Sequence, residues 1–472
     1  MATSICPAQK VATGPFERGP NVSYDLLYYL ATEYLEDAAS TVASLSLTCR
    51  SMAAMLRYIK YRSVCVNLRC RSGENTGVYN DVSSPAERLT QVFRDDPQVI
   101  QFVKVLWIGQ QSTSDLSLFI YRPEAIPERR ALCYILTRPF PLLRSLTLFA
   151  GRRRKKDGED VTMATARPLP QTLVNALNSA FALSTLSKVS ISFEKSIPIS
   201  SLRSLHSIDT LAISGELFDD MPHVTGQPGQ TCRPCTLCIE DEGALTVLRT
   251  KYSPLFDFGG VTTLIIRHPG PRDMLTTGIS ARRFPAVITL KIFSEELEQW
   301  FRPWTPLGLS EFRTMKSLTL CFDRPMPGVL ARNHFSTLIS LLSPRSQPVQ
   351  VESITLLLYE PFLLQSWNDT GNSNSLESHL RIRDWIYSYD QTTWKSLQDI
   401  FVASSTTVKR EIWPNLERIC IGYYSPDIED HTKIFFRDAL SNRLKGLVKS
   451  GLLQIEVERS AKPFREQELW LA

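Results

Sequence analysis

From Val103 onward, the chain repeats one spacing of apolar residues: an apolar residue, two others, a second apolar residue, one other and a third. The last two apolar positions of each copy are called anchors here. The anchors are Leu106 and Ile108, Leu146 and Leu148, Val189 and Ile191, Leu211 and Ile213, Leu237 and Ile239, Leu264 and Ile266, Leu290 and Ile292, Leu318 and Leu320, Ile354 and Leu356, Ile419 and Ile421, and Ile455 and Val457. The intervening positions are mostly Ser, Thr, Lys, Arg or Asp, so the pattern predicts strands buried on one face and wet on the other.

The spacing between copies indicates how these strands are arranged. Successive first anchors are 40, 43, 22, 26, 27, 26, 28, 36, 65 and 36 residues apart, and the middle five steps match leucine-rich repeats. One strand with its connection cannot bury its apolar side alone, whereas stacked units can. Helices that could cover the sheet are predicted at 171–182, 335–342, 376–389, 394–403 and 432–449. We therefore expect an α/β fold with a parallel sheet in a leucine-rich-repeat-like solenoid; the alternative is a doubly wound α/β domain.

The stretch 21–68 carries more apolar residues than so short a unit can bury. A helix is predicted from Ser23, whose hydroxyl can cap it, followed by helices near 41–48 and 50–60. The alternation of Val64, Val66 and Leu68 then predicts a strand. Because a core of under about 70 residues supplies only a few kcal/mol, this unit must pack against a neighbour or a partner.

The order of residues in this stretch resembles the F-box, the motif that joins substrate receptors to Skp–cullin–F-box ubiquitin ligases. The matching residues are Tyr24, Asp25, Leu26 and Leu27, then Leu45, Leu47, Cys49, Arg50 and Met52, then Tyr61, Arg62 and Val64. Ser23 replaces the usual proline, Met52 the usual aromatic residue, and 36–40 lengthens the joint between helices. The resemblance implies that a Skp-type adaptor, and through it a cullin, binds Val22, Leu26, Leu27, Leu30, Leu45, Leu47 and Met52. The irregular repeats resemble those of fungal F-box proteins.

Four segments follow from these patterns. We expect a disordered leader at 1–20, the F-box-like helical domain at 21–68, a linker and helix at 69–101, and the repeat domain at 102–472 with insertions at 151–170 and 359–414. The first insertion holds the basic run GRRRKKDGED, which is interpreted as a solvated loop, with a nuclear-import signal as the alternative.

Composition narrows the classes of function. A net charge of +5 over 472 residues, with no dense basic groove, argues against nucleic-acid binding. No run of 18 apolar residues and no signal peptide is present, so no membrane partner is expected and the location is cytoplasmic and/or nuclear. The ten scattered cysteines are typical of reduced thiols.

The residues with catalytic or metal-binding chemistry do not form a recognisable site. Cys232, Cys235 and Cys238, with His223, suggest zinc, but Cys235 would share the face of the anchors while Cys238 would point the other way. Neither a G-x-S-x-G elbow nor a phosphate-binding glycine loop is present, and the six histidines are dispersed. The sequence therefore predicts no enzyme, no metal and no cofactor.

The leading hypothesis is a substrate receptor whose repeat domain holds a target protein near a charged ubiquitin-conjugating enzyme. The alternative is a repeat scaffold with a helical N-terminal cap and no ligase role. Residues flanking the anchors are expected on the concave face, which nominates Trp107, Thr147, Lys188, Lys291, Thr319 and Arg418 for target binding.

Overall fold

The computed structural model describes part of the chain. The described ranges are 56–68 without 58, 84–109, 126–149, 169–192, 197–214 without 206, 231–239, 255–267, 284–294, 309–323, 348–359, 391–402, 412–424 and 430–458, with residues 339, 342, 383, 386 and 387. The leader, the seven nominated adaptor-binding residues from Val22 to Met52, residues 151–168 of the first insertion and most of insertion 359–414 lie outside them. The chain divides into two compact units, Met1–Ser63 and Val64–Ala472.

In the first unit, the described residues are the end of a helix and a turn. Leu56 and Ile59 of this helix are buried, and the backbone amide of Tyr61 donates to the carbonyl of Arg57. The amide of Arg62 donates to Ile59 at 3.2 Å, which closes the helix just before the first strand begins.

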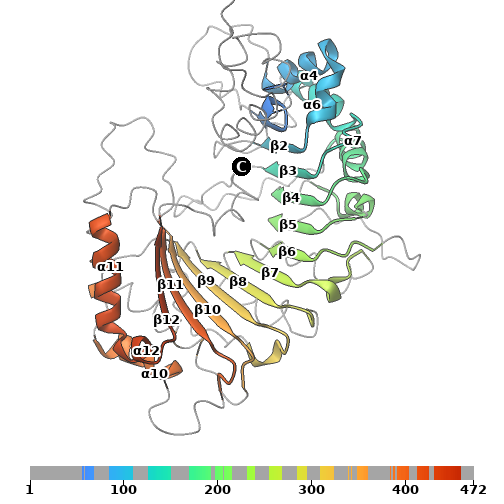
Figure 1. Cartoon of the computed structure of the whole chain (residues 1–472). Helices are drawn as coiled ribbons and strands as arrows, with labels where there is room; N and C mark the ends of the chain where they lie inside the picture. The colour runs from blue at the N-terminus through green and yellow to red at the C-terminus, as the bar shows by residue number, and fades with distance from the viewer. Residues whose placement is uncertain are drawn as a thin grey trace, which may run out of the picture. The chain divides into compact units, whose positions relative to one another are not determined.

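Among the described residues twelve strands form one sheet, and they follow one another in the order of the sequence (Figure 1). The strands are β1 Ser63–Asn67, β2 Val105–Gly109, β3 Ser145–Phe149, β4 Lys188–Ser192, β5 Thr210–Ser214, β6 Thr236–Ile239, β7 Thr263–Arg267, β8 Thr289–Ser294, β9 Ser317–Asp323, β10 Ser353–Tyr359, β11 Arg418–Tyr424 and β12 Leu453–Glu458. The eleven strands predicted from the anchors and the strand predicted at 64–68 are confirmed. The doubly wound alternative is wrong, because such a sheet reverses its strand order at a switch point and this one does not.

The pairing aligns the anchors into two continuous rows. From β2 to β12 every described pair is parallel, and from β2 to β11 each first anchor is the register partner of the next: Leu106 pairs with Leu146, and Ile354 with Ile419. At β12 the register differs from the expected one by two residues, because the first anchor Ile455 pairs with the second anchor Ile421. The anchors from Leu106 to Ile421 are buried. We call this side of the sheet the anchor face and the other side the opposite face.

A turn with an apolar residue at its start precedes most of these strands. In each case the amide of the residue three before the first anchor donates to the carbonyl three residues earlier, as Val287 does to Phe284 and Met315 to Phe312. The starting residue is Phe140, Phe284 or Trp413 in three copies, and a proline follows each of them, at the turn position whose φ proline fixes. The turn therefore sets the chain direction before each strand.

A row of shared carbonyls joins the turns from one strand to the next. The carbonyl of Ile288 accepts hydrogen bonds from the amides of Lys316 and Ser317, at 2.8 and 3.0 Å. The same double acceptance recurs at Lys104, Arg144, Ser187, Asp209, Cys235, Thr262, Lys316 and Glu352. These nine residues form what we call the carbonyl ladder, which aligns the start of each strand from β3 to β11 with the strand before it.

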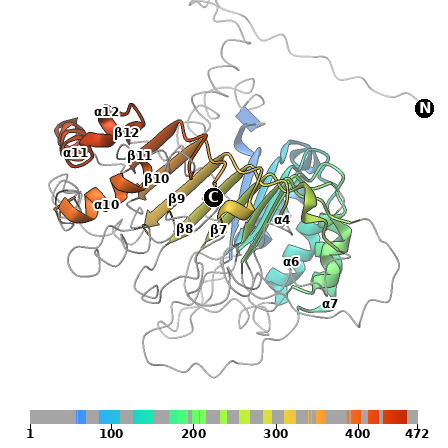
Figure 2. The ribbon, with the colours of Figure 1, turned by 90° about the horizontal axis from the view of Figure 1, so that it is seen from below.

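Helices lie at both ends of this sheet (Figure 1). They are α4 Pro85–Asp95, α6 Ile126–Leu136 and α7 Gln171–Phe181 beside the early strands, and α10 Gln391–Phe401, α11 Asp430–Arg443 and α12 Lys445–Lys449 beside the last ones, with short 3-10 helices η1 Pro97–Phe102, η3 Ile199–Ser204, η6 Phe258–Gly260 and η9 Leu309–Glu311. Figure 2 shows α10, α11 and α12 together at the β12 end. The ring of Phe436 from α11 lies 5.7 Å from that of Tyr423, so α11 packs on the anchor face.

Of the five helix predictions two are confirmed and one is split in two, and those at 335–342 and 376–389 lie mostly outside the described residues. The helix expected at 171–182 is α7, and the one expected at 394–403 is α10. The single helix expected at 432–449 is two, because the backbone leaves the helical region at Leu444, with φ −113° and ψ 40°. Helix α6 was not predicted. In the linker segment 69–101, α4 begins with a capping box between Ser84 and Glu87, which fits a helix N-terminus.

Candidate functional site

The opposite face is not uniformly exposed to solvent, contrary to the expectation from the alternating pattern. Its residues lie in register rows, and the row between the two anchors of each strand includes Thr147, Ser190 and Ile265, all of them buried. A parallel sheet is commonly buried on both faces. The prediction failed because it judged each strand alone, whereas burial depends on which residues become neighbours across the sheet.

The middle of the opposite face is a hydrophobic cluster. It consists of Ala212, Cys238, Ile265, Phe293, Cys321 and Leu357, one residue from each strand from β5 to β10. We call these six residues the middle cluster. All of them are buried, so this part of the face contributes to the stability of the fold and leaves little of its surface exposed.

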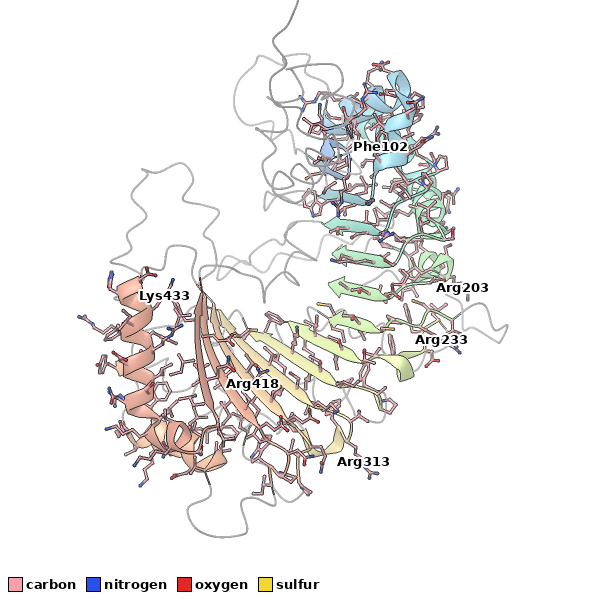
Figure 3. All side chains as sticks on the ribbon, viewed as in Figure 1. Phe102, Arg203, Arg233, Arg313, Arg418 and Lys433 are labelled. Atoms are coloured by element: carbon pink, nitrogen blue, oxygen red, sulfur yellow. The ribbon has the colours of Figure 1, made fainter. Side chains whose placement is uncertain are left out.

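The six residues nominated for target binding share the opposite face, but they differ in exposure. Trp107, Thr147 and Thr319 are buried, Lys188 and Lys291 are half-buried, and Arg418 is exposed. Figure 3 shows Arg418 over the strands, whereas Arg203 lies in η3, and Arg233 and Arg313 lie in the connections before β6 and β9. Three of the six, on β8, β9 and β11, meet at one place.

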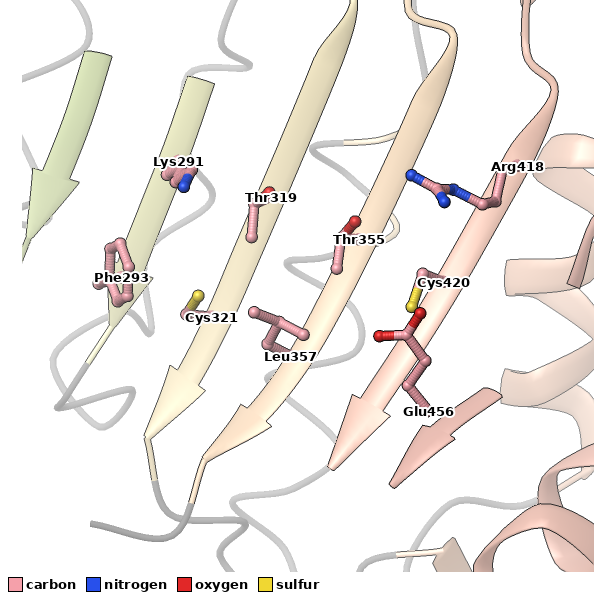
Figure 4. Close-up of a pocket in the computed structure, with 9 residues that line it drawn as sticks. All are labelled: Lys291, Phe293, Thr319, Cys321, Thr355, Leu357, Arg418, Cys420 and Glu456. Atoms are coloured by element: carbon pink, nitrogen blue, oxygen red, sulfur yellow. The ribbon is translucent and has the colours of Figure 1, made fainter. Parts of the chain in front are cut away.

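That place is a pocket of about 210 Å³ on the opposite face of β8–β12 (Figure 4). Its lining residues are Lys291, Phe293, Thr319, Cys321, Thr355, Leu357, Arg418, Cys420 and Glu456. Lys291, Thr319 and Arg418 are the nominated residues that it brings together. The pocket is too small for most drug-sized ligands and fits about one large side chain.

Two register rows give the pocket two kinds of wall. Lys291, Thr319 and Thr355 are partners across β8, β9 and β10 and form what we call the polar row. Phe293, Cys321 and Leu357 lie two residues further along the same strands and form the apolar row. Residues two apart on a strand are about 6.8 Å apart, so polar and apolar groups face a ligand side by side.

The charged residues stand at the two ends of the pocket. Lys291 comes from β8, while Arg418 and Glu456 come from β11 and β12. Figure 4 shows the guanidinium of Arg418 extending toward Thr355 and the carboxylate of Glu456 beside Cys420. Two cations and one carboxylate give the lining a net charge of +1, which favours an anionic group.

The only thiols in the lining are poor nucleophiles or are part of the core. Burial, with a smaller contribution from the Glu456 carboxylate, raises the pKa of Cys420 to about 12. Cys420 is therefore a neutral thiol near pH 7, and the thiolate that nucleophilic catalysis needs is not formed. Cys321 belongs to the middle cluster. The pocket is built to bind rather than to form a covalent intermediate through sulfur.

The three cysteines of the CRPCTLC segment lie in different surroundings. Cys238 is buried in the middle cluster, as expected for the side away from the anchors, but Cys235 is exposed in the carbonyl ladder rather than buried beside Leu237. Cys232 is buried, and burial raises its pKa to about 12. Among the described residues no group of three His, Cys, Asp or Glu side chains could hold a metal ion; His223 lies outside them.

Sequence reasoning missed the apolar row and Glu456. Phe293, Cys321 and Leu357 follow the second anchors of their strands, a position that the pattern did not include. The signal that could have found them is the alignment of the anchors, since adding one more position after each second anchor brings these three apolar residues into one row. Glu456 pairs with Gly422, which pairs with Leu357, so it points to the opposite face in register with the apolar row.

No family model matches this chain, and no curated protein matches it. No helix among the described residues is both long and apolar enough to cross a membrane.

Proposed function

We propose that this chain is the substrate-recognition subunit of a Skp–cullin–F-box ubiquitin ligase. The F-box-like stretch 21–68 binds the Skp-type adaptor, and an irregular leucine-rich-repeat-like solenoid holds a target protein. Thioester chemistry belongs to other subunits of such a ligase, and this chain acts by bringing the target close to them. It works in the cytoplasm and/or the nucleus.

The observation that carries the proposal is the junction of the two parts. The residues that match the exit of the F-box, Tyr61, Arg62 and Val64, close a helix and begin β1, the first strand of a sheet of twelve. A stretch whose sequence carries surplus apolar residues thus leads directly into the sheet. This order is what an adaptor-binding module joined to a recognition domain requires.

The repeating geometry supports the solenoid part of the proposal. The carbonyl ladder and the turns recur at strand after strand, and the strand order follows the sequence throughout. Each unit therefore contacts mainly its sequence neighbours, which is the property that defines repeat architectures.

Adaptor pull-down tests the ligase role. The full-length chain, the double variant Leu26→Asp with Leu45→Asp, and the control Leu142→Asp are each mixed with purified Skp-type adaptor. Leu142 is an exposed leucine in the turn before β3, so its substitution makes the same chemical change outside the motif. We expect the wild type and the control to retain the adaptor and the double variant to lose it. Equal recovery from all three would refute the ligase role.

The scaffold alternative has one observation in its favour. Leu56 and Ile59, in the last predicted helix of the F-box-like stretch, are already buried. A helical cap without a ligase role predicts that no adaptor is recovered from any of the three proteins and that the double variant unfolds at a lower temperature. Thermal unfolding followed by circular dichroism, run on the same samples, separates the two functions.

A further inference from the structure

We infer that the pocket on β8–β12 recognises a target segment in which an acidic residue and an apolar residue are two positions apart. This inference deepens the proposed function, since it names the chemistry of the target that the repeat domain takes. It rests on the polar row, the apolar row and the charges at the ends of the pocket.

The distance between the polar row and the apolar row determines how far apart the two recognised side chains lie in the target segment. Polar and apolar rows are separated by two strand residues, about 6.8 Å. In an extended peptide, side chains at positions i and i+2 point to the same side and are separated by the same distance. A segment that runs along the strands, over Thr319 and Cys321 for example, places one side chain on each row.

The charge of the pocket selects an acidic side chain for the polar row. Arg418 is exposed and extends toward Thr355, so its guanidinium and the threonine hydroxyl can both donate to one carboxylate (Figure 4). The Lys291 ammonium lies at the other end of the same row. A carboxylate carries one negative charge, which matches the net charge of +1. A phosphate carries nearly two, and it would meet the Glu456 carboxylate at the same end of the pocket.

The apolar row selects an apolar neighbour. Phe293, Cys321 and Leu357 are buried members of the middle cluster that still line the pocket. A ligand side chain such as leucine removes their remaining apolar surface, and its own, from water. A pocket of about 210 Å³ that contains both rows has room for one leucine side chain with a carboxylate beside it, so a single acidic–x–apolar unit fills it.

Synthetic peptide pools test the inference on the full-length chain. Each pool is acetylated, amidated and fluorescein-labelled, with Gly and Ser flanks, and contains Asp or Glu two positions from Leu in either order. The matched pools replace the acid with Asn or Gln, place acid and Leu side by side, or carry phosphoserine instead of the acid. Fluorescence polarisation measures the dissociation constants.

We expect the acidic–x–apolar pool to bind at least about tenfold more tightly than the amide pool, because charge-assisted hydrogen bonds are lost with the acid. The adjacent-residue pool binds more weakly, since its two side chains point to opposite sides. Equal binding of the acidic and amide pools, preference for phosphoserine, or no binding of any pool would overturn the inference.

Charge reversal in the pocket provides the second measurement. Arg418→Glu is expected to weaken binding of the acidic pool at least about tenfold and to create a preference for a Lys–x–Leu pool. Arg313→Glu, the same change at an exposed arginine in a turn before β9, is expected to change neither. Identical preferences in both variants and the wild type would contradict a role for the pocket.

The adaptor pull-down keeps this inference separate from the proposed function. Arg418→Glu is expected to retain the adaptor, because Arg418 lies far along the sequence from the F-box-like stretch. Peptide selection without adaptor binding would refute the ligase role and keep the pocket. Adaptor binding without peptide selection would refute the role of the pocket and keep the ligase role.

Discussion

The two faces of the sheet differ in how their composition changes along the strands. The anchor face is the same from β2 to β11, with buried aliphatic residues at both anchors of each strand. The opposite face changes from hydroxyl residues at Thr147 and Ser190, through the middle cluster, to the charged pocket. A repeated face can only stabilise the fold, because it presents the same chemistry everywhere. The face that varies is therefore where recognition can be specific.

The largest effect on this comparison is expected from a polar substitution in the buried middle cluster. Ile265→Asn places an amide among buried apolar residues, which loses apolar burial and leaves polar groups unpaired. We expect the free energy of unfolding to fall by about 3–6 kcal/mol. Ile288→Asn is the matched control, since Ile288 is 42% exposed, and it should change stability by less than about 0.5 kcal/mol. Urea denaturation measures both; similar losses in the two variants would mean that the opposite face is not buried.

The second prediction compares the two faces within neighbouring strands. Leu318→Ala on the anchor face of β9 leaves a cavity and should cost about 2–5 kcal/mol. Thr355→Ala removes a half-buried hydroxyl from the polar row and should cost less than about 1 kcal/mol. Chemical denaturation of each variant gives the two free energies. A larger loss of unfolding free energy for Thr355→Ala than for Leu318→Ala would contradict the assignment of stability to the anchor face and of recognition to the opposite face.

The third prediction concerns the buried thiols of the opposite face and of the turn before β6. Cys420 and Cys232 have a pKa of about 12 in the folded chain, against about 8.5 in an unfolded one. Both pKa values are raised, so their contribution to stability is complete below pH 8.5 and is lost as pH rises toward 12. Stability should fall by up to about 1.4 kcal/mol per pH unit for each thiol above pH 8.5. Unfolding of the wild type and of Cys232→Ala between pH 7.5 and about 10 checks this, and an equal slope in both would contradict it.

The smallest effect is expected at the amino edge of the sheet, which belongs to neither face. Lys316 donates a hydrogen bond to Glu352 at 2.8 Å, and this bond, together with the negative charge, raises the pKa of Lys316. Both side chains are exposed to solvent, where ion pairs contribute little. Lys316→Ala should therefore leave the urea midpoint unchanged, because the ladder uses the backbone carbonyl of residue 316 and not its side chain. A clear drop in the midpoint would show that side chains hold the ladder.

Most of the fold could be predicted because its signals are local. Each strand carries its own anchors within a few residues, so Leu264 and Ile266 predict β7 without reference to any other strand. Helix α6 was missed although its buried residues, from Glu128 to Leu136, recur at helical spacing, because the first of them is the charged Glu128. Helix α11 ends before Leu444, a buried leucine and not a helix-breaking residue.

Less of the site could be predicted, because it depends on register between distant segments. Lys291, Thr319 and Arg418 were found from their positions beside single anchors. Their meeting with Leu357 and Glu456 requires that five strands align, across intervals of up to 65 residues between first anchors. The burial of Trp107 and Thr147 could not be predicted either, because it depends on the neighbouring residues across the sheet, which the local sequence does not specify.

The carbonyl ladder has a consequence for how this chain tolerates changes in length. Each rung is made by two consecutive amides and one carbonyl immediately before the strands, so nothing in it depends on how many residues connect one strand to the next. First anchors 22 residues apart and first anchors 65 residues apart accordingly produce the same pairing. Peptide tags or whole reporter domains could therefore be placed between β10 and β11, and the alignment of Ser353 with Arg418 should survive them.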